Sequence, residues 1–215
     1  MTSPDRNTES HPATPRSPSA RLTPGELLAS LETTLRLHPG GPLWLFAYGS
    51  LIWRPECPAV EARRARLHGY HRGLYLWSQI HRGTPECPGL VLGLDRGGSC
   101  SGFAYRLPDE DRDAHLLALW QREMPDAAYK PKWLTCRLDD GSRVPALCFV
   151  LRRDQPCYAG SLPDHVISQV FADARGHYGS TRDYVEQTVR ALRTHAMPDR
   201  RLEAALARCC QRQEA

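Results

Sequence analysis

The chain has 215 residues, of which 41% are apolar and 24% charged, as in an ordinary globular protein. With histidine neutral its net charge is +4, and the basic residues are scattered, whereas nucleic-acid binding usually leaves a dense basic stripe. No apolar run approaches the length that spans a bilayer, so we expect one domain with neither a nucleic-acid nor a membrane partner.

The first 22 residues are rich in Ser, Thr and Pro and lack the apolar block of a signal peptide. We predict a disordered tail over residues 1–22 and a single folded domain over residues 23–215. The eight cysteines include no C-x-x-C pair of the kind that binds zinc or exchanges disulfides. We therefore expect free thiols in the reducing cytoplasm and no metal site.

The first predicted helix begins at Thr23-Pro24-Gly25-Glu26, which has capping-box spacing and Pro at the first helical position. The His-Pro-Gly-Gly segment at residues 38–41 ends this helix. A buried strand is predicted at Leu43–Ala47. It runs directly into a glycine-containing break at Tyr48–Leu51.

Short strands are predicted next, at residues 62–67, 74–78, 90–94 and 102–107. We interpret Asp95–Ser99 as a hairpin turn between the last two strands. After a helix over Asp109–Met124, the segment Asp139-Asp140-Gly141-Ser142 is a hairpin signal between strands at 133–138 and 144–151. Three helices follow, over residues 163–175, 180–195 and 200–212. Strands this close in sequence leave no room for βαβ crossovers, which favours an α+β fold with a mixed, barrel-like sheet.

Glu123 is the first candidate for chemistry. Leu116, Leu119 and Trp120 precede it at helical spacing, which puts its carboxylate at the end of the apolar face of the predicted helix. A carboxylate in that place is paired with a cation, has a raised pKa, or both. Periodicity alone favours an ion pair with an arginine from elsewhere. Arg122 is not the expected partner, because adjacent helix positions point apart.

Other candidates are weaker on their own. The break at Tyr48–Leu51 can present consecutive backbone N–H groups to a carboxylate or an oxyanion, but such residues also make ordinary turns. Arg82 is a candidate carboxylate ligand or a solvated residue, His81 a base or a structural histidine, and Tyr158 a hydrogen-bond donor or a packing residue. Nucleophilic catalysis has poor support, since Ser50 has no G-x-S-x-G context and no histidine partner at a recognisable spacing.

Taken together, segments in a fixed order resemble the ChaC family. They are Leu43–Pro55, Gly69–Arg72, His81–Pro85, Pro88–Leu94, Gly102–Tyr105, Arg122–Met124, Tyr158–Gly160, Gly176–Ser180 and Asp183–Tyr184. The resemblance runs from about residue 43 to about residue 205 and leaves the N-terminal tail outside. In one small departure, Ala47 stands where relatives often have Gly.

The resemblance implies a γ-glutamylcyclotransferase-like fold, a small mixed β-barrel with surrounding and C-terminal helices, in one catalytic domain over residues 23–215. It also implies an enzyme without cofactors that cleaves glutathione into 5-oxoproline and cysteinylglycine. Glu123 matches the family's catalytic glutamate, which acts first as a general base and then as a general acid. This match replaces the interpretation of Glu123 as a structural ion-pair residue. The substrate-binding residues that we expect are Tyr48, Gly49, Ser50, Leu51, Ile52 and Trp53 from the matching loop, together with Arg82 and Tyr158.

Two alternatives stay open. A γ-glutamyl amidase with a serine or cysteine nucleophile would release glutamate instead of 5-oxoproline. A γ-glutamyl-binding regulatory protein would bind the ligand without turnover, because a fold alone does not fix a function. The sequence also leaves open the oligomeric state and the preference for glutathione over other γ-glutamyl compounds.

Overall fold

The computed structural model describes residues 20–211. Of the predicted tail 1–22, residues 1–19 lie outside the described residues. The end of that segment lies against the chain that follows helix α2 (Arg112–Glu123): the amide of Leu22 donates to the carbonyl of Pro125 at 3.1 Å, and Arg21 forms a β-bridge with Asp126.

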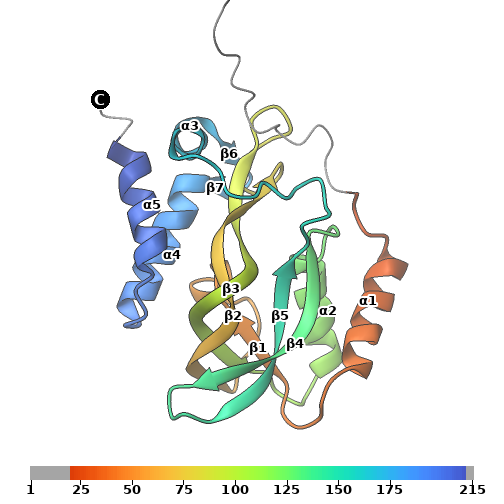
Figure 1. Ribbon diagram of the computed structural model, residues 1–215. Helices are drawn as coiled ribbons and strands as arrows, with labels where there is room; N and C mark the ends of the chain where they lie inside the picture. Colours follow the sequence, from red (N-terminus) through yellow and green to blue (C-terminus); the bar gives the residue numbers. More distant parts are fainter. Residues whose placement is uncertain (1–19, 212–215) are drawn as a thin grey trace, which may run out of the picture.

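The described residues form a barrel with helices on two sides (Figure 1). The helices are α1 (Pro24–Arg36), α2, α3 (Asp164–Asp173), α4 (Thr181–Thr194) and α5 (Arg200–Gln211), with a 3₁₀ turn η1 (Ser50–Ile52). The strands are β1 (Trp44–Ala47), β2 (Glu61–Ser78), β3 (Gly89–Arg106), β4 (Tyr129–Leu138), β5 (Arg143–Leu151), β6 (Arg175–Gly176) and β7 (Gly179–Ser180).

The first five strands close into a barrel in the order β1-β3-β2-β4-β5. β1 pairs antiparallel with β3 and parallel with β5, so the sheet is mixed. All four residues of β1 are buried, because this strand has neighbours on both edges and covered faces on both sides. The predicted α+β fold with a mixed barrel is confirmed, and the structure adds that the barrel is closed.

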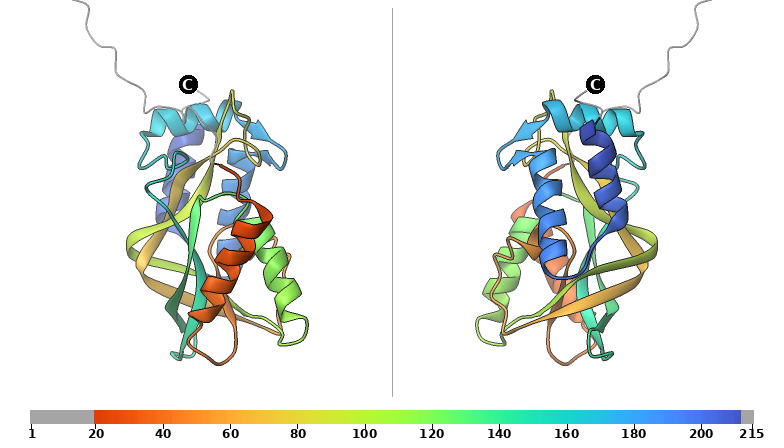
Figure 2. Two further views of the ribbon diagram at one scale, coloured as in Figure 1. Left: turned by 90° about the vertical axis from the view of Figure 1, so that its right-hand side faces the viewer. Right: turned by 90° about the vertical axis from the view of Figure 1, so that its left-hand side faces the viewer.

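The four short strands predicted between residues 62 and 107 are two continuous strands of 18 residues each. The hairpin turn predicted at Asp95–Ser99 is wrong, because β2 and β3 pair on both sides of it. Gly97 and Gly98 have φ angles of 99° and 68°, and together they form a bulge that bends the ribbon without reversing it. The bent pair curves around the barrel (Figure 2), and the chain reverses at residues 79–88 instead.

Two helix pairs flank the barrel. α2 packs with α1 on one side, and α4 and α5 lie side by side on the other (Figures 1 and 2). Leu116, Leu119 and Trp120 are buried on α2, and the Trp120 ring meets the ring of Phe149 on β5 with centroids 5.4 Å apart. This apolar contact fixes α2 on the barrel and sets the place of the residues at its C-terminal end.

Local sequence signals were reliable at the element ends. Thr23 and Glu26 form the predicted capping box, with the Glu26 amide 3.2 Å from Thr23 Oγ1. The predicted turn at residues 139–142 joins β4 and β5. Within residues 20–211, none of the helices combines the length and apolar character needed to cross a bilayer.

Candidate active site

Glu123 is the last residue of α2, and its side chain is 17% exposed. Burial raises the pKa of its carboxyl, the charge of Arg122 opposes this effect, and the charge of Glu56 adds to it. The net direction is upward. This carboxyl therefore holds a proton more readily than a glutamate in water.

Arg122 is the ion-pair partner of Glu123, so the expectation that the two side chains point apart is wrong. The distance from Arg122 Nε to Glu123 Oε1 is 3.0 Å. The helix ends at Glu123, and the long Arg122 side chain reaches beyond it to the segment after β1. There its Nη1 donates to the carbonyl of Arg54 at 2.8 Å and to Glu56 at 3.0 Å, and its Nη2 donates to Ser50 Oγ at 3.2 Å.

The loop Tyr48–Trp53 follows β1 and contains η1. The Tyr48 hydroxyl donates to the carbonyl of Phe149 at 3.1 Å. The Tyr48 carbonyl accepts a hydrogen bond from the buried Arg72, whose Nε lies 2.7 Å from Asp199. The backbone hydrogen bonds of the described residues include none donated by the amides of residues 49–51. Of these three residues, Ser50 is partly exposed, whereas Gly49 and Leu51 are buried.

Helix α4 supports this loop from behind. Trp53 Nε1 donates to Thr188 Oγ1 at 3.1 Å. A Cβ on Gly49 would lie 3.0 Å from the Tyr184 hydroxyl oxygen, so a glycine lets the loop approach α4 closely. Burial raises the pKa of Tyr184 to about 12, which keeps its hydroxyl protonated at neutral pH.

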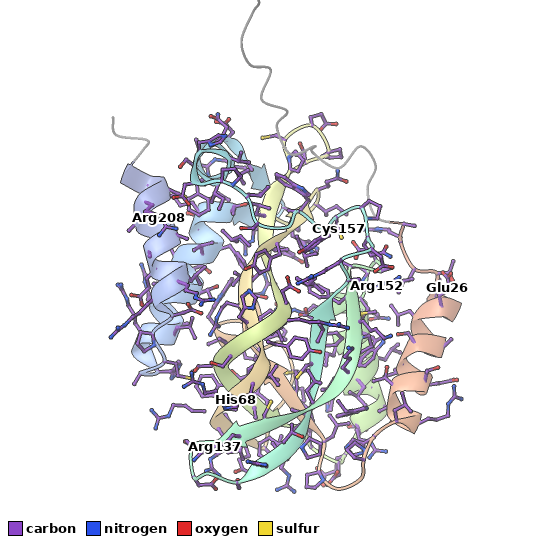
Figure 3. The ribbon with its side chains drawn as sticks, viewed as in Figure 1. Glu26, His68, Arg137, Arg152, Cys157 and Arg208 are labelled. Carbon is purple, nitrogen blue, oxygen red and sulfur yellow. The ribbon has the colours of Figure 1, made fainter. Side chains whose placement is uncertain are left out.

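A cavity of about 850 Å³ brings four of the predicted site residues together: Glu123, Ser50, Trp53 and Arg82 all line it. Cys157 is also in its wall. Figure 3 shows Cys157 at the end of the barrel away from Arg137, which lies beside the turn between β4 and β5. The cavity therefore belongs to one end of the barrel, where α2 and the loop after β1 meet.

Other predicted residues do not line this cavity. Tyr48, Gly49, Leu51 and Ile52 are buried behind Ser50 and Trp53. Tyr158 is absent from the lining, and its hydroxyl lies 3.5 Å from Asp95 Oδ2. Its segment bridges to Leu76 of β2, and neighbouring residues of an extended segment face opposite ways, so Cys157 faces the cavity and Tyr158 does not.

Three tyrosines in the cavity wall, Tyr129, Tyr178 and Tyr184, were not assigned from the sequence. Tyr129 lies at the start of β4 and donates to the carbonyl of Leu92 at 3.0 Å. Nothing in its local sequence marks it, because its hydroxyl contacts Leu92 of β3, a strand distant in the sequence. Tyr184 belongs to a segment that resembles the ChaC family, which was the signal available for it.

His81 and Asp126 also belong to the polar part of the wall. Burial and the charge of Arg82 lower the pKa of His81, which favours the neutral imidazole. Burial raises the pKa of Asp126. Within residues 20–211, no three or more His, Cys, Asp or Glu side chains are arranged to hold a metal ion.

Comparisons with known proteins find similar sequences. A sequence profile described as ChaC-like protein matches residues 43–212. The chain is 40% identical over 158 residues to a protein of Escherichia coli (strain K12) named glutathione-specific gamma-glutamylcyclotransferase, covering 73% of this chain and 68% of that protein. It is 33% identical over 147 residues to glutathione-specific gamma-glutamylcyclotransferase 1 of Mus musculus, covering 66% of each. The chain thus spans about two thirds of the length of these relatives.

The fold also has solved counterparts. The crystal structure of a gamma-glutamyl cyclotransferase specific to glutathione from yeast matches with a TM-score of 0.72 at 20% identity. The match covers 80% of this chain and 97% of that chain. The closed barrel with its surrounding helices is therefore a γ-glutamylcyclotransferase-like fold, as expected from the sequence.

Proposed function

Since this chain belongs to the ChaC-like protein family, we propose that it is a γ-glutamylcyclotransferase that converts glutathione to 5-oxoproline and cysteinylglycine. In this reaction the α-amine of the γ-glutamyl group attacks the carbonyl carbon of its own side-chain amide. A five-membered lactam closes, the bond from that carbon to the cysteine nitrogen breaks, and cysteinylglycine leaves. The observation that carries the proposal is the position of Glu123 in the wall of the same cavity as Ser50.

Glu123 is proposed to move the proton. The α-amine arrives as an ammonium with a pKa of about 8, whereas an ordinary glutamate has a pKa of about 4.3, a mismatch of about 5 kcal/mol. Burial of Glu123 narrows this gap, because it raises the pKa of the carboxyl. The same carboxyl then returns the proton to the nitrogen of the leaving cysteine.

The loop Tyr48–Trp53 is proposed to hold the γ-glutamyl group and to stabilise the oxyanion of the tetrahedral intermediate. Of residues 49–51, whose amides donate no backbone hydrogen bond within the described chain, Ser50 lines the cavity, so its amide can donate to an oxygen of the substrate. A loop fixed by Arg72, Arg122 and α4 also favours a folded substrate with its amine close to the carbonyl. Ser50 and Trp53 face the cavity, and Tyr48, Gly49, Leu51 and Ile52 support them from behind.

A γ-glutamyl amidase has less support. Ser50 Oγ accepts its hydrogen bond from Arg122, and a guanidinium does not act as a base. Burial raises the pKa of the Cys57 thiol, which disfavours the reactive thiolate. Product identification after incubation of the purified protein with glutathione separates the hypotheses. We expect 5-oxoproline and cysteinylglycine in equal amounts, whereas free glutamate would indicate an amidase, and binding without product a regulatory protein.

We also propose that the protein works in the cytoplasm. The eight cysteines, all within residues 20–211, form no disulfide bond, as expected in a reducing compartment. Fractionation of the cells that make the protein tests this proposal, and recovery outside the cytoplasm would contradict it.

A further inference from the structure

Arg82 is a buried cation without a carboxylate partner in the described part of the chain. The residue is 5% exposed, and no carboxylate oxygen of residues 20–211 lies within 4.0 Å of its guanidinium nitrogens. Burial lowers the pKa of this guanidinium. Buried charges are normally paired, but Asp183 acts on Arg82 through its charge without forming an ion pair with it, so the guanidinium can still bind an anionic group directly.

The hydrogen bonds of the guanidinium leave one edge open. Its Nη1 donates to the carbonyl oxygens of Tyr178 and Ser180, the latter at 3.4 Å. Within residues 20–211, no acceptor contacts its Nε or Nη2. These two nitrogens form an edge that matches the two oxygens of a carboxylate. Because Arg82 lines the cavity, the structure suits a ligand that brings a carboxylate into it.

The backbone of Arg82 is held in place by close contacts. Its amide donates to Ser78 Oγ at 3.1 Å. A Cβ on Gly89 would lie 2.1 Å from the Arg82 carbonyl oxygen, and a Cβ on Gly176 would lie 2.5 Å from its nitrogen. Both positions therefore need glycine, and the reversal between β2 and β3 presents Arg82 from a fixed position.

Arg82 lies on the side of the cavity formed by the loop Tyr48–Trp53. The centre of its guanidinium is 5.0 Å from the ring centroid of Tyr184 and 6.0 Å from that of Trp53. Trp53 belongs to the loop, and the Tyr184 hydroxyl packs against Gly49 within it. The same loop is joined to Glu123 through Arg122.

We infer that the guanidinium of Arg82 binds the α-carboxylate of the γ-glutamyl group, an inference that rests on the proposed function. Glutathione carries two carboxylates. The α-carboxylate is attached to the same carbon as the attacking amine, and that amine must come close to Glu123 beside this loop. The glycine carboxylate is at the other end of the tripeptide, far from the reacting carbonyl. Because Arg82 lies next to the loop Tyr48–Trp53, it is placed to bind the α-carboxylate.

The test compares three substrates with the wild-type protein. Glutathione is the reference, and its turnover to 5-oxoproline tests the proposed function itself. In 4-aminobutyryl-cysteinylglycine the α-carboxylate is missing, but the amine can still close a lactam, 2-pyrrolidinone, and release cysteinylglycine. In γ-glutamylcysteinylglycinamide the glycine carboxylate is replaced by an amide. We expect kcat/KM to fall about 100-fold or more for the aminobutyryl compound, as for the loss of one side of a buried charge pair.

Arg82→Gln and Arg82→Lys complete the comparison, with Arg193→Gln, an exposed arginine outside the cavity lining, as the control. Arg82→Gln should lower kcat/KM about 100-fold or more for glutathione and for the glycinamide. For the aminobutyryl compound it should change kcat/KM less than about fivefold, because the lost partner is already absent. Arg82→Lys should recover part of the lost kcat/KM, since lysine keeps the positive charge but cannot donate two parallel hydrogen bonds to one carboxylate.

Three outcomes would overturn the inference while glutathione turnover still stands. One is a wild-type protein that uses the aminobutyryl compound as well as glutathione. Another is an effect of Arg82→Gln that disappears with the glycinamide, which would assign Arg82 to the glycine end. The third is an equal loss for all three substrates, which would indicate a structural role. If both Arg82 variants fail to fold, the comparison of the three substrates with the wild-type protein still tests whether the α-carboxylate is required.

Discussion

The Nε of Arg122 lies 3.0 Å from the carboxylate of Glu123, while Nη2 of the same guanidinium donates to Ser50 Oγ. One side chain therefore fixes the acid relative to the loop after β1. It also opposes the effect of burial on the pKa of that acid. The geometry of the site and the proton affinity of Glu123 depend on the same arginine.

Replacing Arg122 by Met should move the acid limb of the kcat–pH profile to higher pH. The acid limb reports protonation of the base, and removing the Arg122 charge, which lowers the pKa of the Glu123 carboxyl, raises that pKa. Rates measured from pH 4 to 9 test this expectation, with Arg122→Lys as the control that keeps the charge. If the acid limb of Arg122→Met stays in place or moves to lower pH, the charge of Arg122 does not lower the pKa of Glu123.

The stability of Glu123→Gln relative to the wild type should depend on pH. The folded wild type holds the Glu123 proton more tightly than the unfolded chain, where the pKa is about 4.5. Its free energy of unfolding therefore falls as pH rises from about 4.5 to the folded pKa, and this loss persists at higher pH. Glutamine has no such titration. Urea titrations should show Glu123→Gln gaining stability relative to the wild type across that window, and a relative loss would contradict the raised pKa.

Ser50→Ala should lower kcat/KM by roughly fivefold, the effect of one hydrogen bond worth about 1 kcal/mol. The proposed role of this loop depends on its backbone amides, which the substitution keeps. Steady-state kinetics with glutathione measure the effect. A loss of about 1000-fold, as expected for a missing nucleophile, would instead support the amidase hypothesis.

Arg72→Met should lower the free energy of unfolding by about 3 kcal/mol, because it breaks an ion pair whose Arg72 side chain is buried and removes the cation beside Asp199. It also removes the hydrogen bond to the Tyr48 carbonyl at the base of the loop. The matched control is Arg193→Met, which removes an exposed pair with Glu203 and should leave the urea midpoint unchanged. Equal midpoints for the two variants would show that the Arg72 pair contributes nothing.

Elements whose evidence is local were predictable from the sequence. The capping box at Thr23, the buried strand at Leu43–Ala47 and the turn at residues 139–142 all depend on a few adjacent residues. The segment Asp95–Ser99 was different. Glycines at positive φ form both turns and bulges, and the choice here depends on whether β3 continues to pair with β2, which is a long-range contact.

In the candidate site, too, features set by local sequence were predictable and features set by long-range contacts were not. Helical spacing placed Glu123 on the buried face of α2, since that depends on one helix. Its contact with Arg122 depends on the helix end and on the loop from Ser50 to Glu56, which periodicity does not describe. Tyr129 lines the cavity and donates to the carbonyl of Leu92 on β3, a contact between segments distant in the sequence, so no local pattern identified it.

The central claim is that the Glu123 carboxyl moves the proton in the cyclisation, and Glu123→Gln tests it most directly. The measurement is the rate of 5-oxoproline formation from saturating glutathione, with a thermal melt and a glutathione binding titration on the same sample. We predict a loss of about 1000-fold or more, with cooperative unfolding and a Kd within a few-fold of the wild type. Formation of 5-oxoproline at a rate near that of the wild type would contradict the account.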